Sequence, residues 1–269
     1  MLGAIIGDMV GSPFEFDRNA RLKTTLFPLF GPESGFTDDT VMTLAVGSAL
    51  MEADDDEDRA EALVVTSMRA FAAAYPLPKG GYGGRFSAWL VSPDPRPYGS
   101  WGNGSAMRTS AAGWLYPTLE DTERWATLAA RVTHNHPEGL KGAQAVAVAI
   151  FLARQGAGKD AIKDLVTSRY GYDLRRTLDD IRPTYHHVES CQETVPEAIT
   201  AFLESDGFED AIRKAVSLGG DADTLTDITG AIAEAAYGIP DAIRDEALSR
   251  LPGPLVNVLE RFWTVVARV

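Results

Sequence analysis

The sequence predicts an all-α fold, packed as a compact multi-helix bundle around one core. The first observation is periodicity: apolar residues recur at helical spacing in nearly every segment, whereas the alternation typical of strands is almost absent. The second is size, because 269 residues with 45% hydrophobic side chains suit a single core that needs neither disulfides nor a structural metal. We therefore expect one domain over residues 1–269. The helical spacing is clearest in Ala143, Val146, Ala147, Ile150 and Phe151.

Start and stop signals divide the chain into short helices. Pro137 and Pro240 suit first helical positions, and Gly219 follows a last helical turn. The segment 142–153 is rich in Ala and Gly, which favours a central helix that its neighbours approach closely. In chain order, helices are expected over residues of about 41–53, 58–74, 84–91, 104–115, 121–132, 138–155, 159–169, 193–204, 207–218, 224–237, 241–250 and 255–268.

Two segments interrupt this helical pattern. Residues 76–104 concentrate Pro and Gly with Tyr82, Trp89, Tyr98 and Trp101, and residues 171–192 contain two adjacent His and the single Cys. Long irregular segments inside a domain are more often functional than accidental. We expect part of the functional site in these segments.

Charge and targeting signals restrict the partners. The net charge of −13 disfavours direct binding to nucleic acid or to an anionic membrane, because both need a basic surface. The longest apolar run, 142–153, is shorter than the ~20 residues of a membrane span, and the N-terminus lacks the basic region of a signal peptide. The lone Cys191 points to a reducing compartment. We expect a monomeric cytoplasmic protein with a small ligand.

Two similar groups of Asp and Thr precede expected helices. They are Thr37-Asp38-Asp39-Thr40 and Asp221-Ala222-Asp223-Thr224. Either group alone could simply cap its helix. Capping needs one oxygen per helix, however, and each group supplies two carboxylates and a hydroxyl. Such oxygens are the ligands that Mg²⁺ or Mn²⁺ prefers, so the pair predicts a site for two ions if the two helix starts meet in space.

A glycine-rich turn lies between these groups. In Gly102-Asn103-Gly104-Ser105-Ala106-Met107-Arg108 the turn leads into a helix, where backbone N–H groups can bind a phosphate. The segment matches neither the P-loop nor the dinucleotide-binding pattern. A plain loop-to-helix junction is an equally good interpretation at this point.

Glu15 and two histidines complete the candidates. Glu15 lies between two Phe, where an apolar setting would raise the pKa of its carboxyl and suit acid or base chemistry; the alternative is a surface acid on a bend. His134 and His136 precede the central helix. Their H-x-H spacing lacks the further ligands of a zinc site, which favours contact with an anionic substrate or a structural hydrogen bond.

Taken together, these motifs resemble the ADP-ribosylglycohydrolase family. They occur in the family's order and span about residues 3 to 238. The matching motifs are Gly7-Asp8-x-x-Gly11 with Glu15, Phe36-Thr37-Asp38-Asp39-Thr40, Gly102-Asn103-Gly104-x-x-Met107-Arg108, Thr133-His134-x-His136-Pro137, and Gly219-Gly220-Asp221-x-Asp223-Thr224 with Gly230.

The resemblance implies an all-α orthogonal bundle that hydrolyses the N- or O-glycosidic bond between ADP-ribose and its acceptor, a protein or a small conjugate. It implies Glu15 and Asp38 as catalytic residues, and aromatic residues around Tyr82 and Trp101 that flank the ligand. Two Mg²⁺ (or Mn²⁺) cofactors are implied at Thr37, Asp38, Asp39, Asp221, Asp223 and Thr224. Contacts with ADP-ribose are implied for Gly102, Asn103, Gly104, Ser105, Met107, His134 and His136.

Two other functions stay open on the sequence alone. The chain could be an ADP-ribose-binding module with little activity, or a dinuclear-metal hydrolase of another phosphorylated metabolite. The acceptor is equally open, because it is recognised by the shape of loops.

Overall fold

The computed structural model describes residues 1–17, 23–53 and 56–268, and within them the chain is helical, with no β-strand and two isolated bridges. This confirms the all-α prediction. The elements are α1 (Leu2–Gly11), the 3₁₀ helix η1 (Ser12–Asp17), α2 (Asp38–Glu52), α3 (Glu57–Ala74), α4 (Gly84–Leu90), α5 (Gly104–Met107), α6 (Ser110–Leu115), α7 (Leu119–Arg131), α8 (Pro137–Arg154), α9 (Lys159–Tyr170), α10 (Leu178–Ile181), α11 (Cys191–Leu203), α12 (Phe208–Val216), α13 (Ala222–Tyr237), α14 (Asp241–Ser249) and α15 (Gly253–Val266).

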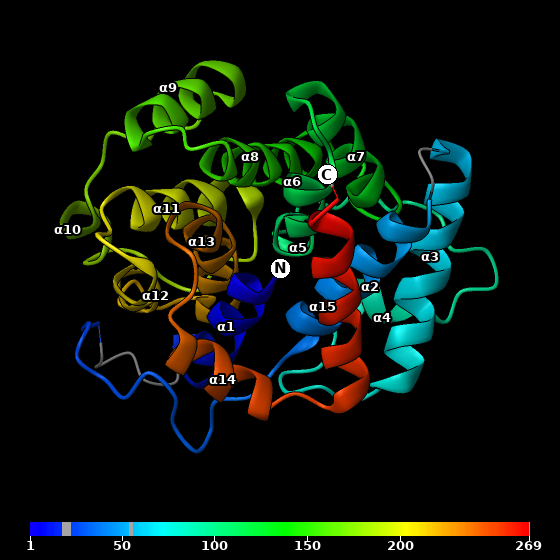
Figure 1. The fold of residues 1–269 in the computed structure, drawn as a ribbon, viewed down its shortest axis with the longest axis horizontal. Coiled ribbons are helices and arrows are strands. Elements are labelled where there is room, and N and C mark those ends of the chain that lie inside the picture. The colour runs from blue at the N-terminus through cyan, green and yellow to red at the C-terminus, as the bar shows by residue number, and fades with distance from the viewer. Residues whose placement is uncertain (18–22, 54–55, 269) are drawn as a thin grey trace.

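Three helices, α1, α8 and α13, form the centre of the bundle. Every residue of α1 is buried, as is every residue of α13 from Ala222 to Glu234. Helix α8 contacts both α7 and α13, as expected for the Ala-rich segment. In Figure 1, α2, α3 and α15 lie on one side of this centre and α11 and α12 on the other. None of the helices in the described part is long and apolar enough to span a bilayer.

Glycines allow α1 and α13 to pack side by side in opposite directions. A Cβ placed on Gly7 would lie 2.1 Å from the Thr226 carbonyl oxygen, and one on Gly11 would lie 2.4 Å from that of Ala222. The four-residue spacing of these glycines therefore serves close packing between the two helices. The same contact aligns the C-terminal end of α1 with the start of α13.

The chain differs from the sequence prediction mainly at α1 and at the expected helix 104–115. The structure has two helices in place of this one, because Arg108 and Thr109 separate α5 from α6. The Arg108 guanidinium is buried at this break and donates to the Thr133 hydroxyl and, more weakly, to the Ala129 and Ala130 carbonyls. A side chain anchored across the bundle thus interrupts what the apolar pattern predicts to be continuous.

Candidate active site

The first Asp/Thr group lies at the start of α2. Thr37 caps this helix, since its hydroxyl accepts a hydrogen bond from the Asp39 backbone N–H at 3.1 Å. The capping interpretation is therefore correct for Thr37. It does not account for the two carboxylates, because Asp38 and Asp39 both line a cleft.

The second group lies at the start of α13, where capping explains still less. Asp221 occupies the N-cap position without a side-chain capping bond. Its Oδ2 instead accepts a hydrogen bond of 2.6 Å from the Asn103 side-chain amide. Asp223 Oδ1 accepts from the Thr224 backbone N–H at 3.0 Å.

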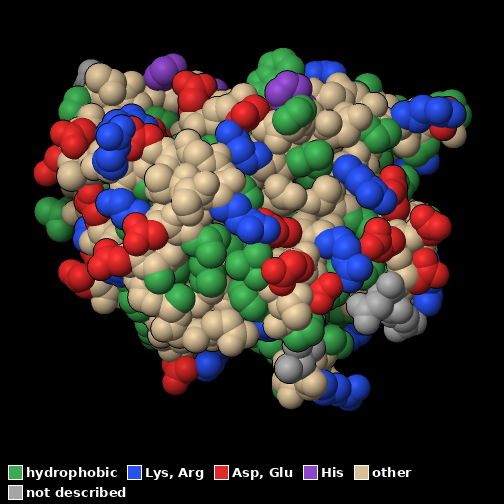
Figure 2. Space-filling view, turned by 90° about the horizontal axis from the view of Figure 1, so that it is seen from above, with side chains coloured by type: hydrophobic (Ala, Val, Ile, Leu, Met, Phe, Trp, Pro, Cys, Tyr) green, Lys and Arg blue, Asp and Glu red, His purple; other side chains and the backbone are tan. Residues whose placement is uncertain are grey.

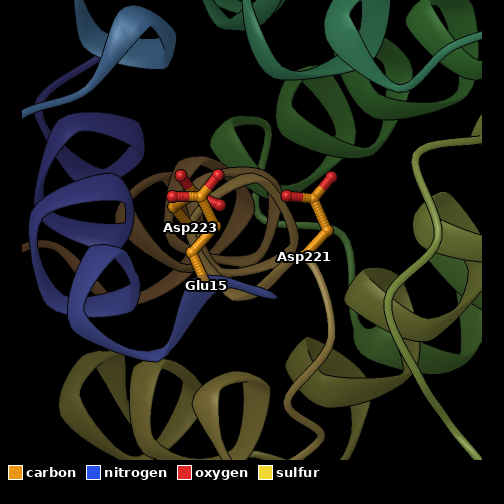
Figure 3. Close-up of side chains that lie close together, drawn as sticks. All are labelled: Glu15, Asp221 and Asp223. Carbon is orange, nitrogen blue, oxygen red and sulfur yellow. The ribbon is translucent and has the colours of Figure 1, made fainter. Parts of the chain in front are cut away.

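The two helix starts meet in space, which was the condition that the sequence left open. The Thr224 hydroxyl donates a 2.7 Å hydrogen bond to Asp39 Oδ2 across 185 residues of chain. Glu15, at the end of the N-terminal segment, joins the same site: single oxygens of Glu15, Asp221 and Asp223 all lie within 4.8 Å of one another. Figure 3 shows these three carboxylates directed into one space, from η1 and from the start of α13.

Burial and mutual repulsion dominate the electrostatics of this site. Burial, followed by the charge of Asp223, raises the pKa of Asp38, Asp39 and Asp221 well above its ordinary value. Burial also raises the pKa of Asp223 itself. Acids this close cannot all ionise unless positive charge is supplied, and a divalent cation among them would restore the ionised form.

Two further buried acids lie beside this group. Asp8 in α1 accepts hydrogen bonds through Oδ2 from the backbone N–H groups of Thr37 and Thr40, at 2.9 and 3.1 Å, and from the Thr40 hydroxyl. It thereby holds the start of α2 in place. Asp227, one turn into α13, has a pKa raised well above its ordinary value by burial and then by Asp8 and Asp223. The sequence pattern assigned neither residue a role; for Asp8, the one charged side chain in an otherwise apolar helix, that contrast was the available signal.

A cleft of about 360 Å³ opens above the acids. It is lined by Glu15, Asp38, Asp39, Met42, Gly80, Gly81, Tyr82, Gly83, Gly84, Arg85, Phe86, Tyr98, Ser100, Gly102, Asn103, Gly104, Met107, Arg108, His134, Glu189, Asp221, Asp223 and Thr224. Both irregular segments therefore contribute, as expected. Gly80, with φ of +81°, lets the backbone pass Glu15 so closely that a Cβ there would lie 3.2 Å from its Oε2.

The structure brings most of the expected ligand contacts to this cleft. Gly102, Asn103, Gly104, Met107 and His134 line it. Asn103 also ties the glycine-rich turn to the acids, because its amide donates to Asp221 and to the Thr194 hydroxyl.

Three of the residues expected beside the ligand lie elsewhere, and Thr37, expected to bind metal, is also absent from the cleft lining. Ser105 is buried, with its hydroxyl donating to the Gly139 carbonyl at 2.8 Å, and His136 caps α8 by accepting from the Glu138 N–H at 3.2 Å. Neither residue is part of the cleft lining. Trp101 is 48% exposed and lines an adjoining groove with Glu189 and Glu193.

Comparisons with known proteins identify the family of the chain. The sequence model of the ADP-ribosylglycohydrolase family matches residues 1–268. The chain is 29% identical to the ADP-ribosylhydrolase ARH3 of Homo sapiens, over 89% of this chain and 84% of that protein. It is 27% identical to the ADP-ribosylarginine hydrolase Tri1 of Pseudomonas putida, over 89% of this chain and 70% of that protein.

A solved structure is similar as well. It is that of an ADP-ribosylglycohydrolase-related protein complex, which is 27% identical, with a TM-score of 0.65 over 99% of this chain and 92% of the other. The family match covers nearly the whole sequence, and each of the matching motifs contributes at least one residue to the lining of the acidic cleft. The chain belongs to the ADP-ribosylglycohydrolase family.

Proposed function

We propose that this protein is a metal-dependent hydrolase that cleaves the N- or O-glycosidic bond between ADP-ribose and its acceptor. The hydrogen bond between Thr224 and Asp39 carries the proposal, because it joins two Asp/Thr groups that are far apart in sequence. Relatives named as an ADP-ribosylhydrolase and an ADP-ribosylarginine hydrolase support the reaction class.

The residues of the site fit two Mg²⁺ or Mn²⁺ ions. The side chains that would hold them are Thr37, Asp38, Asp39, Asp221, Asp223 and Thr224, all with oxygen donors. The raised pKa values of Asp38, Asp39 and Asp221 support this assignment, because a divalent cation among these mutually repelling carboxylates would favour their ionised form. When bound, such ions would neutralise the carboxylates and lower the pKa of a water molecule.

The protein's own groups would divide the remaining work. Glu15 or Asp38, both in the cleft, would take up the proton of the water that attacks C1″ of the ribose and return it to the acceptor nitrogen or oxygen as the glycosidic bond breaks. Asn103 holds the Asp221 carboxylate in its orientation. The backbone of the Gly102–Gly104 turn and the His134 side chain would bind the diphosphate, with Tyr82 beside the ligand. Ser105 would support this turn from behind, because its hydroxyl donates to the Gly102 and Gly139 carbonyls, whereas the His136 side chain caps α8.

The deciding experiment measures release of ADP-ribose from ADP-ribosyl-Arg, ADP-ribosyl-Ser and O-acetyl-ADP-ribose, with Mg²⁺ and with EDTA. We expect release from at least one substrate with Mg²⁺ and none with EDTA. The double variant Asp38→Ala/Asp223→Ala should lose the activity and keep its helical circular dichroism spectrum. A matched double variant of two exposed acids, Asp58→Ala/Asp164→Ala, should keep both.

Other outcomes would replace the proposal. Full activity in the Asp38→Ala/Asp223→Ala variant would contradict it. ADP-ribose binding in calorimetry without release from any substrate would indicate a binding module. Turnover of only a different phosphorylated metabolite would indicate the second alternative.

We further propose that residues 1–269 form a single domain and that the protein acts as a monomer in the cytoplasm. The contacts of α13 with α1, α8, α11 and α12, which join distant parts of the chain, support one domain. Light scattering coupled to size-exclusion chromatography tests the monomer, for which a mass near 29.0 kDa is expected.

A further inference from the structure

Arg108 is a buried cation at the edge of the cleft. Its side chain is 1% exposed, and in the described part of the chain no carboxylate forms an ion pair with it. Burial lowers the pKa of its guanidinium to about 10, so that the group stays charged at neutral pH. A guanidinium can only donate hydrogen bonds. Its short contact, 2.7 Å, is to the Thr133 hydroxyl oxygen, which must therefore accept.

The hydrogen bond that Thr133 accepts from Arg108 restricts the hydrogen bond between Thr133 and His134. Its hydroxyl oxygen also lies 2.7 Å from Nδ1 of His134, and within the described residues these are its two hydrogen-bond contacts. The hydroxyl has one proton. Having accepted from Arg108, it can satisfy that proton by donating to Nδ1. With a proton on Nδ1 instead, the buried hydroxyl would accept twice and its own proton would be left unbonded, which costs free energy.

The other ring nitrogen of His134 lies beside the glycine-rich turn. A Cβ built on Gly102 would lie 3.4 Å from His134 Nε2, and one on Gly104 would lie 3.5 Å from it. His134 lines the cleft and is 5% exposed. Burial, with help from Arg108 and Arg85, lowers the pKa of its imidazole well below the usual value, so the ring is neutral at neutral pH.

We propose that Arg108 and Thr133 are positioning residues that fix the His134 imidazole as the Nε2–H tautomer, with that N–H available to an oxygen acceptor on the ligand. Neither residue needs to touch the ligand, because Arg108 acts through Thr133 and Thr133 through Nδ1. The identity of the acceptor, a diphosphate oxygen of ADP-ribose, rests on the proposed function. The tautomer does not, since it follows from hydrogen bonds within the protein.

Nitrogen-15 NMR of protein labelled at the histidine rings tests the tautomer directly. The chain has four His, and the signals of His134 are identified by their loss in His134→Gln. Wild type and Thr133→Ser, which keeps the hydroxyl, should show an unprotonated Nδ1 and a protonated Nε2. Thr133→Val, which has nearly the same volume without the hydroxyl, should show a mixture of tautomers. Calorimetry should find ADP-ribose affinity weaker in Thr133→Val, by about twofold for an equal mixture of tautomers, and unchanged in Thr133→Ser.

A protonated Nδ1 in the wild type would overturn the proposal, as would a Thr133→Val protein with both the tautomer and the affinity of the wild type. The wild-type spectrum decides the tautomer even if Thr133→Val does not fold. Failure of the proposed function would give a different result. If the wild-type protein has the Nε2–H tautomer but binds no ADP-ribose in the presence of Mg²⁺, ADP-ribose is not the ligand. The positioning role of Arg108 and Thr133 is then still supported.

Discussion

At the scale of single residues, Asp223 is the acid whose charge repels most of the other carboxylates in this site. Its charge raises the pKa of Asp8, Asp38, Asp39 and Asp221. Asp38 is half-buried and the other groups are buried, so water screens the repulsion poorly. The acids are therefore unfavourable for stability when no cation is bound, and the protein keeps them together for a purpose other than folding.

Replacing Asp223 with Asn should stabilise the metal-free protein. The amide keeps an oxygen for the Thr224 N–H while it removes the charge that repels the other acids. For a relief of about 1 kcal/mol, the melting temperature in EDTA should rise by about 2–4 °C. Scanning calorimetry measures this, with the exposed acid Asp164→Asn as the unchanged control. A lower melting temperature in Asp223→Asn would show that the carboxylate stabilises the fold.

The stability of the metal-free protein should fall with rising pH. Burial, with the charge of Asp223, raises the pKa of Asp8 from 3.8 to about 7, so the folded state binds more protons than the unfolded state in between. Stability from this group is complete below about pH 4 and is lost as pH rises through 7. Urea unfolding in EDTA between pH 5 and 8 should show the loss. Saturating Mg²⁺ should reduce it; an equal loss with Mg²⁺ would argue against a cation at the acids.

Residue types alone identify much of the site. The paired Asp and Thr at two helix starts are recognisable in the sequence, because their number exceeds what capping needs. Asp227 and the location of Ser105 are not predictable in this way, since both depend on which side of a helix faces the cleft. His136 illustrates the same limit: its hydrogen bond to the Glu138 N–H is structural, although its motif suggests a ligand contact.

At the scale of elements, the packing of α1 against α13 fixes the positions of the buried acids relative to one another. Asp8 on α1 binds the start of α2, and Asp223 lies at the start of α13. The glycine contacts between α1 and α13 thus set the distance between these carboxylates. Under the proposed function, packing and metal binding are coupled through this helix pair.

Gly7→Ala should therefore weaken both stability and metal affinity. Its Cβ would lie 2.1 Å from the Thr226 carbonyl oxygen, so the helices must separate, at a cost of about 1–3 kcal/mol. Gly253→Ala at the start of α15, where a Cβ meets nothing within 4 Å, is the matched control and should be neutral or slightly stabilising. Urea unfolding and Mn²⁺ titration measure the two effects. If Gly7→Ala lowers the stability but leaves the Mn²⁺ affinity at its wild-type value, helix packing and metal binding are independent, which contradicts the prediction.

The sequence pattern predicts most helices with ends within a few residues but misses α1 and α10. Helix α1 shows one reason. A helix that is buried on all sides has no polar face, so the periodicity that reveals other helices is absent. The short α10 lies in a segment that was expected to be irregular. The break at Arg108 depends on partners more than 20 residues away, which no local pattern encodes.

At the scale of the whole molecule, the net charge of −13 must be reconciled with an anionic ligand. On the face in Figure 2, acidic and basic side chains are interspersed, so the surface there is not uniformly negative. Inside the cleft, the acids would be neutralised by the cations that they bind. Anion binding and net negative charge are then compatible.

ADP-ribose affinity should accordingly depend on metal. Without cations, the diphosphate would approach buried carboxylates, and calorimetry in EDTA should show affinity at least tenfold weaker than in Mg²⁺. Raising the salt concentration should change this ratio little, because buried charges are poorly screened. Equal affinity in Mg²⁺ and EDTA would place the diphosphate away from the acids.

The central claim is that the starts of α2 and α13 together hold two divalent cations. Isothermal titration calorimetry, with Mn²⁺ added to the metal-free protein, tests this claim most directly. We predict two ions per chain for the wild type and for Asp58→Ala/Asp164→Ala, and none bound with comparable affinity for Asp38→Ala/Asp223→Ala. Wild-type Mn²⁺ binding in the Asp38→Ala/Asp223→Ala variant would contradict the claim.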